Sequence, residues 1–138
     1  MTPEQLAAIH DRAMTETKAW SAQDFADLLQ QTGVFVVGSP QSFALGRVIF
    51  DEAELLTIVT DPAAQKQGLG HRTLTQFHEN AQGLGAVIAF LEVSVENLPA
   101  ISLYRTAGWQ EAGKRKSYYH LQDGRVVDAL VMSRSLPA

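Results

Sequence analysis

The sequence predicts one α+β domain with a mixed β-sheet, and three observations support this. The chain has 138 residues, a typical length for one domain, and 46% of them are hydrophobic, which is enough for a core. The spacing of the apolar residues predicts the element order two helices, three strands, a helix, a strand, a helix and two strands. The strand–helix–strand unit at residues 54–93 predicts a right-handed parallel crossover, whereas short turns make the other strands antiparallel. Without repeats or linkers, residues 1–138 are expected to form a single domain.

The first 33 residues predict two short helices. Residues 2–5 read Thr-Pro-Glu-Gln, the pattern of a capped helix start, and an apolar stripe follows at Leu6, Ile9 and Ala13. Residues 21–24 read Ser-Ala-Gln-Asp and give a second start before Phe25, Leu28 and Leu29. We expect Gly33 to end this second helix as its C-cap residue.

From residue 34 the apolar pattern becomes that of strands. Residues 34–37 and 43–50 predict two strands around a turn at 38–41. After a connection at 51–53, residues 54–60 predict a third strand. Asp61-Pro62 ends it, because the residue before a proline is disfavoured in helical conformation.

The second half alternates helix and strand before a closing hairpin. A helix opens after residues 65–70, with apolar positions at helical spacing as far as Leu84. Residues 86–93 are apolar on both faces, as expected for a strand near the centre of a sheet. Residues 97–107 predict another helix, and residues 109–121 and 125–133 predict a hairpin.

Composition excludes several classes of function. Eleven basic and 15 acidic residues give a net charge of −4, which argues against nucleic acid as a partner but suits a basic peptide. The absence of cysteine excludes disulfides, thiolate metal ligands and covalent cysteine catalysis. The longest apolar run, residues 86–91, is far shorter than the ~20 residues that span a membrane. With no signal-peptide pattern at the start, we expect a cytoplasmic protein with no membrane partner.

The chain has four histidines, a residue type that often binds metal ions. They show no metal-ligand spacing, and we expect all of them to face solvent: His10, His71, His78 and His120. The sequence therefore predicts no metal site.

A glycine loop between a strand and a helix is the first candidate site. Residues 65–70 read Gln-x-x-Gly-x-Gly, and backbone N–H groups at a helix start suit a phosphate. A Walker loop would need Lys-Ser/Thr where His71-Arg72 stands, and a dinucleotide fingerprint would need glycine where Thr73 stands. A tight helix entry without a ligand is an equal alternative.

A second motif lies on the helix after the central strand. Asn97 is placed to cap that helix, and Pro99 falls in its first turn, where no N–H is needed. Tyr104 follows Asn97 by seven residues and therefore shares its face, before Gly108-Trp109. The alternative for Tyr104 is a half-buried tyrosine with no role in chemistry.

Together these motifs resemble the GNAT acetyltransferase superfamily over roughly residues 34–134, and within it the bacterial ribosomal-protein-alanine N-acetyltransferases. The closer resemblance rests on these segments: Asp61-Pro62, Gln65 to Gly70, Leu91-Glu92-Val93, Asn97, Ile101 to Tyr104 and Tyr118-Tyr119. The chain departs from the family at His71, where Arg or Lys is common, and its first 33 residues match only through Trp20-Ser21.

The resemblance implies acetyl-CoA as cosubstrate, with its pyrophosphate on the loop and its pantetheine arm along a strand edge. The residues it implies for binding are Ile58, Val59, Thr60, Gln65, Lys66, Gln67, Gly68, Leu69, Gly70, His71, Arg72 and Asn97. It also implies Tyr104 as the acid that protonates the departing thiolate.

Glu92 is the candidate general base, with Glu96 as the fallback. Glu92 shares a strand face with Ile88 and Phe90 at the carboxyl end, where open sheets bind ligands, and we expect an apolar setting for it. Tyr118 and Tyr119 follow a basic stretch and line the acceptor site or simply pack across strands.

An α-amine has a pKa of about 7.7–8.0 against about 10.4 for lysine, so a weak base suffices for an N-terminus. We therefore predict transfer of acetyl to the N-terminal α-amine of a peptide or protein, with a ribosomal protein as one candidate. The alternatives are an acetyltransferase for a small amine or amino acid, and a non-catalytic acyl-CoA-binding module.

Overall fold

The structure is a computed structural model that describes residues 1–15 and 17–137. Its elements are α1 (Pro3–Ala13), α2 (Ala22–Leu29), β1 (Val34–Ser39), β2 (Ser42–Ile49), β3 (Glu52–Thr60), η1 (Pro62–Ala64), α3 (Leu69–Gly83), β4 (Ile88–Ser94), α4 (Leu98–Thr106), β5 (Gln110–His120) and β6 (Val126–Ser135). The strands form one sheet in the order β1-β2-β3-β4-β6-β5, with β3 and β4 parallel and the other neighbours antiparallel. The predicted α+β fold with a mixed sheet is confirmed.

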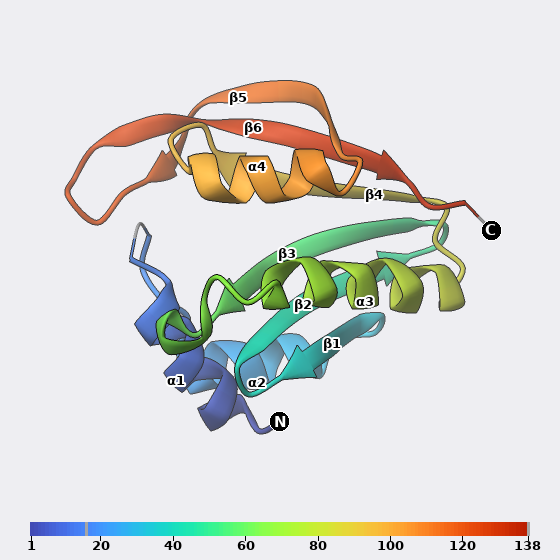
Figure 1. Ribbon diagram of the computed structural model, residues 1–138, viewed down its shortest axis with the longest axis horizontal. Coiled ribbons are helices and arrows are strands. Elements are labelled where there is room, and N and C mark those ends of the chain that lie inside the picture. Colours follow the sequence, from blue (N-terminus) through green and yellow to red (C-terminus); the bar gives the residue numbers. More distant parts are fainter. Residues whose placement is uncertain (16, 138) are drawn as a thin grey trace.

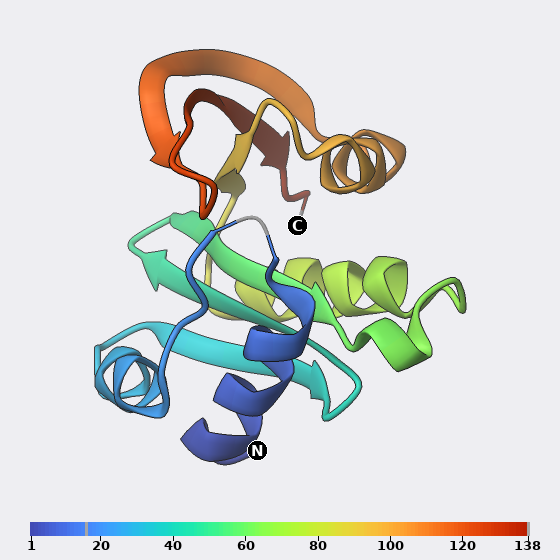
Figure 2. The same ribbon diagram turned by 90° about the vertical axis from the view of Figure 1, so that its left-hand side faces the viewer.

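Helices cover both faces of the sheet, as Figures 1 and 2 show. α1 and α2 lie on one face, where Leu6, Ile9 and Phe25 pack against β2 and β3. α3 and α4 lie on the other face, and Leu74 and Phe77 belong to the larger core there. The sheet is thus buried on both sides, which agrees with the apolar character of its central strands.

The helix starts follow the predicted signals. Thr2 and Ser21 each accept a hydrogen bond from the backbone N–H three residues on, and both close a capping box. The prediction for Gly33 is wrong, because α2 already ends at its C-cap residue Gln30. Gly33 has φ +86° in the turn before β1, where a Cβ would lie 2.2 Å from the carbonyl oxygen of Val48. Glycine at this position lets the backbone of β2 come close.

β3 carries one extra residue in the middle of the sheet. Leu45 of β2 pairs with Thr57 and the next residue, Gly46, pairs with Leu55, so Leu56 of β3 is bulged out of the ladder. Because side chains alternate along a strand, the extra residue changes which face the later residues occupy. Leu55 therefore packs in the core under α3 and α4, whereas Val59 packs in the core under α1 and α2.

The parallel pairing of β3 with β4 ends just before this bulge. It covers only the pairs Glu52–Ile88, Ala53–Ala89 and Glu54–Phe90. β4 then continues along β6, while β3 continues along β2, and the two strands diverge in Figure 1. The second half of β3 consequently has a strand neighbour, β2, on one side only.

Close packing over Gly46 gives a first prediction. A Cβ on Gly46 would lie 2.6 Å from Phe77 and 2.7 Å from Phe35, whose rings stack at 5.7 Å. We expect Gly46→Ala to lower the free energy of unfolding by about 1–3 kcal/mol, because the stacked rings must separate. Urea denaturation measures it, and Gly83→Ala is the control, since its Cβ would meet open space at the end of α3. Equal stability of Gly46→Ala and the wild type would contradict the packing argument.

Candidate active site

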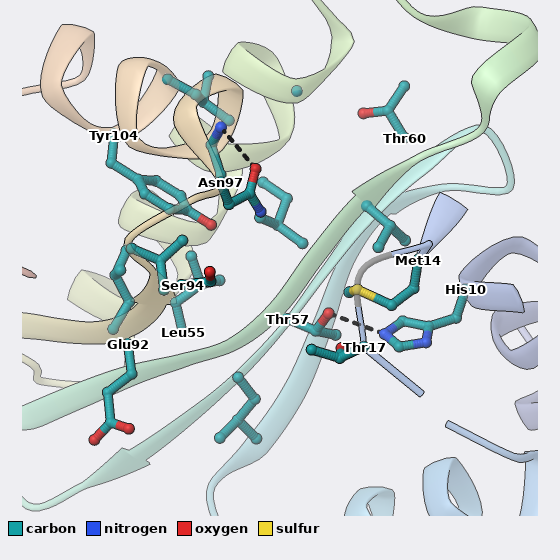
Figure 3. A pocket seen from close by; sticks show the side chains of 18 of the residues that line it. His10, Met14, Thr17, Leu55, Thr57, Thr60, Glu92, Ser94, Asn97 and Tyr104 are labelled. Carbon is teal, nitrogen blue, oxygen red and sulfur yellow. Dashed lines mark hydrogen bonds between the residues drawn. The ribbon is translucent and has the colours of Figure 1, made fainter. Parts of the chain in front are cut away.

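A cavity of about 240 Å³ lies where β3 and β4 diverge. β3 contributes residues 55–60 and β4 contributes residues 91–94, and α4 closes one side with Asn97 and Tyr104. His10 lines the opposite side (Figure 3), and Trp20 is also among the lining residues. The cavity therefore collects residues from both halves of the divided sheet.

A wider groove of about 610 Å³ adjoins this cavity. Glu92 and Tyr119 line both spaces. The groove adds charged and aromatic side chains that the cavity lacks: Lys18, Glu54, Tyr118 and His120. Glu92 consequently stands where the two spaces meet.

The predicted glycine loop leads into the helix beside the cavity. Lys66 and Gly68 have φ +65° and +77°, and Gly68 is the N-cap residue of α3 without a side-chain cap. The first backbone N–H groups of a helix have no acceptor within it, so those of Leu69 to His71 are available at the positive end of the helix dipole. A Cβ on Gly68 would meet nothing within 4 Å, so the space above the loop is open. The loop has the geometry of an anion site.

Hydroxyl groups fix the end of β3 to the start of α3. Ser42 Oγ lies 3.0 Å from Thr60 Oγ1 and 2.8 Å from Thr73 Oγ1. Thr73 stands where a dinucleotide fingerprint has its third glycine. Its side chain is buried and takes part in this hydrogen-bond network. Thr60 and Gly70 both line the cavity. The predicted strand edge at 58–60 and the glycine loop are thus adjacent.

Asn97 and Tyr104 lie together on α4, as their spacing predicts. Asn97 Oδ1 accepts a hydrogen bond from the N–H of Ala100 at 3.3 Å and caps the helix. Tyr104 is 6% exposed and points into the cavity in Figure 3. Burial, and to a smaller extent Tyr119, raises the pKa of the Tyr104 phenol. The phenol therefore keeps its proton throughout the neutral pH range.

The setting of Glu92 differs from the expectation. Arg115 Nε lies 3.2 Å from Glu92 Oε1, so the predicted apolar setting is wrong. Arg115 is the last residue of β5 to pair with β6 before residues 116–118 bulge between the pairs Arg115–Ala129 and Tyr119–Val127. The Ser117 N–H donates to Asp128 Oδ1 at 2.9 Å and holds the bulge.

Both tyrosines of the predicted acceptor site line the groove. The Tyr119 hydroxyl donates to the backbone carbonyl of Glu92 at 2.9 Å, which ties β5 to β4. Tyr118 is 47% exposed, its ring lies 5.1 Å from the Arg115 guanidinium, and the Glu92 carboxylate raises its pKa. Glu96 instead forms an ion pair with Arg125 at 3.0 Å and lines neither the cavity nor the groove.

Two of the four histidines are buried, which corrects the expectation that all face solvent. His10 is 1% exposed and His78 is 8% exposed, whereas His71 and His120 are exposed. His78 Nε2 accepts a hydrogen bond from Trp109 Nε1 at 3.0 Å. Burial lowers the pKa of each buried histidine to about 4, so both are neutral at pH 7. His10, Met14, Thr17 and Trp20 also line the cavity, and no sequence motif indicates them, because they are far from the motifs in sequence.

Among residues 1–15 and 17–137, no group of three or more His, Cys, Asp or Glu side chains is placed to hold a metal ion. Within the same part of the chain, no helix combines the length and apolar character needed to span a membrane.

The sequence model of the Acetyltransferase (GNAT) family matches residues 4–109. The chain belongs to this family. The ribosomal protein bS18-alanine N-acetyltransferase of Escherichia coli is 34% identical over 136 residues, which cover 96% of this chain and 91% of that protein. The N-alpha-acetyltransferase RimI of Mycobacterium tuberculosis is 36% identical over 104 residues, 75% of this chain and 62% of that protein. The family resemblance is confirmed.

Solved structures agree with the family. A crystal structure of the Escherichia coli ribosomal-protein-alanine N-acetyltransferase matches with a TM-score of 0.86 at 32% identity, over 99% of this chain and 88% of that one. Arabidopsis thaliana NAA60 in complex with acetyl-CoA shares the fold, with a TM-score of 0.81 at 14% identity over 97% and 93% of the chains. The protein is an acetyl-CoA-dependent N-acetyltransferase.

The buried histidines predict how stability depends on pH. Their folded-state pKa lies below the unfolded value of about 6.5, so between these values the unfolded chain binds protons that the folded chain does not. We expect the free energy of unfolding to fall as the pH decreases from 6.5 toward 5, measured by urea denaturation. His78→Gln should reduce this dependence, whereas His120→Asn, at an exposed site, should keep it. A stability that is constant over this range would contradict the burial of both rings.

Proposed function

We propose that this acetyltransferase transfers the acetyl group of acetyl-CoA to the N-terminal α-amine of a protein, of the ribosomal-protein-alanine type. The observation that carries the proposal is the groove beside the cavity, which meets it at Glu92 and is larger than the cavity itself. A small amine would need only the cavity, whereas a peptide chain needs a path that leads away from its reacting end. The two bacterial relatives named above are N-terminal or ribosomal-protein-alanine acetyltransferases, which supports the same acceptor. The cytoplasm stays the predicted location.

The residues of the chain fit acetyl-CoA as the donor. The N–H groups of residues 66–71 would bind the pyrophosphate, since the start of α3 is uncapped and the space over Gly68 is open. The pantetheine arm would lie along residues 58–60 of β3 in the manner of an added strand, because β4 has left that edge. Lys66 and Arg72 are exposed and add positive charge near the loop. The thioester would then reach the cavity between Glu92 and Tyr104.

The chemistry needs one base and one acid. Glu92, directly or through a water molecule, takes a proton from the α-ammonium group, and the free amine attacks the thioester carbonyl carbon. The new C–N bond forms and the C–S bond breaks, and the Tyr104 hydroxyl gives its proton to the departing thiolate. The nitrogen atom then loses its second proton, which restores the Tyr104 hydroxyl. Because acetyl passes directly to the amine, no covalent enzyme intermediate is needed, which agrees with a chain that has no cysteine.

The decisive assay measures thiol release from acetyl-CoA with alanine-starting peptides whose second residue is basic or aromatic. The same peptides with a blocked N-terminus and a panel of free amines are the comparison. We expect turnover that disappears when the N-terminus is blocked. Turnover on free amines alone would assign the enzyme to small-molecule acetylation, and binding of acetyl-CoA without any turnover would favour the non-catalytic module.

The loop can be tested separately from the chemistry. We expect Gly68→Val to weaken acetyl-CoA binding by at least about tenfold in titration calorimetry, because its side chain would fill the space over the loop. Gly85→Val is the matched control, since Gly85 also has a positive φ with open space but follows the other end of α3. Equal weakening by both variants would show that backbone strain alone is responsible.

Glu92→Gln tests the base. We expect kcat to fall by about 10²–10⁴-fold while the affinity for acetyl-CoA is unchanged, because the amide accepts no proton. Glu96→Gln is the control, since Glu96 lies in the turn between β4 and α4, paired with Arg125 outside the cavity, and it should keep wild-type turnover. Unchanged turnover of Glu92→Gln at every pH would remove Glu92 from this role.

A further inference from the structure

His10 has a place in the site that the chemistry above does not use. It lies on α1, is 1% exposed and lines the cavity. Its ring stacks on Trp20 with centroids 5.1 Å apart and meets the edge of Phe25 at 5.5 Å. A polar ring enclosed to this degree must have its nitrogen atoms satisfied by hydrogen bonds.

Both nitrogen atoms of the ring have a partner. The backbone N–H of Trp20 donates to His10 Nδ1 at 3.1 Å, so Nδ1 carries no proton. The proton of the neutral ring is then on Nε2, which lies 3.1 Å from Thr57 Oγ1 and donates to it. Burial lowers the pKa of His10 to about 4 and keeps the ring neutral at pH 7. The ring's one lone pair, on Nδ1, already accepts the Trp20 N–H. His10 is therefore excluded as a base for the acceptor amine.

The hydrogen bond to Trp20 fixes a segment that forms part of the acceptor groove. Thr17, Lys18 and Trp20 line the groove, and Thr17 and Trp20 line the cavity as well. A second anchor is in the turn that joins β5 to β6, where Gln122 Nε2 donates to the carbonyl oxygen of Thr17 at 2.6 Å. Residues 17–21 are thus held between α1, this turn and the capping box that Ser21 forms at the start of α2.

We propose that His10 is a positioning residue for the acceptor: through the lone pair on Nδ1 it holds residues 17–21 in the conformation that completes the groove. This inference rests on the proposed function, because it assigns the groove to the acceptor. Glu92 and Tyr104 come from β4 and α4, so loss of the anchor changes acceptor binding and leaves the chemical groups in place. The glycine loop is at the start of α3, and a substitution that keeps the contact with Thr57 keeps the strand edge beside the cavity, so acetyl-CoA binding is also unaffected.

Two amide substitutions separate the two hydrogen bonds of the ring. The side-chain amide of His10→Asn reaches the position of Nδ1 and keeps an acceptor for Trp20. The longer amide of His10→Gln reaches the position of Nε2, keeps the contact with Thr57 and leaves the Trp20 N–H without an acceptor. Each variant loses one buried hydrogen bond, so the pair is matched in its structural cost.

Steady-state kinetics with an alanine-starting peptide measure the outcome. We expect His10→Gln to raise KM for the peptide by about tenfold, with kcat and the dissociation constant of acetyl-CoA unchanged. His10→Asn should have a KM for the peptide within about twofold of the wild-type value. Equal rises in KM for both variants, or a fall in kcat in place of a rise in KM, would overturn the proposal, since a merely structural role predicts no difference between them.

The wild-type protein supplies a test that needs neither a variant nor turnover. Nitrogen-15 spectra of the histidine rings at pH 7 should show His10 neutral with its proton on Nε2, and hydrogen exchange should show a protected Trp20 amide. A proton on Nδ1, or a Trp20 amide that exchanges as fast as an exposed one, would overturn the anchor. If the wild type acetylates no peptide while this anchor is observed, the proposed acceptor fails and the anchor stands.

Discussion

The bulge at Leu56 ends the hydrogen bonding between β3 and β4 after three residue pairs, and the site depends on this interruption. A strand inside a sheet normally has neighbours on both sides, so its backbone is closed to ligands. Here residues 57–60 keep β2 on one side and face the cavity on the other. The bulge also turns Thr57 toward His10, so the same extra residue joins the ligand edge to the anchor of residues 17–21.

Charge is distributed across the site in a way that suits the two substrates. The uncapped start of α3, with Lys66 and Arg72 nearby, offers positive potential for a pyrophosphate. The groove has Glu54 and Glu92 on its wall, which suits an ammonium group. Arg47 is paired with Glu54 at 2.6 Å and Arg115 with Glu92 at 3.2 Å, so the carboxylates are not isolated charges. The two ends of the site thus differ: the start of α3 offers positive potential, whereas the groove offers carboxylates that are paired with arginines.

Features that depend on local sequence could be predicted, and those that depend on distant contacts could not. The order of elements, the capped helices, the glycine loop and the Asn97–Tyr104 face follow from residues that are close in sequence. The bulge at Leu56 leaves no trace in the pattern, because residues 55, 56, 58 and 59 are all apolar and suit either face. The burial of His10 depends on Thr57, 47 residues away, and the charged setting of Glu92 depends on Arg115, which lies on another strand. The neighbours of Glu92 on its own strand are apolar, so that strand alone predicts an apolar setting and gives no sign of Arg115.

Amide hydrogen exchange of β3, with and without acetyl-CoA, tests the central claim most directly. If the divergence of β3 from β4 creates the edge that takes the ligand, amides within residues 57–60 that face away from β2 should become protected when acetyl-CoA binds. Amides of residues 52–54, which already have β4 beside them, should not change. Protection confined to the glycine loop, with residues 57–60 exchanging as before, would contradict the claim that the interrupted strand pairing forms the binding site.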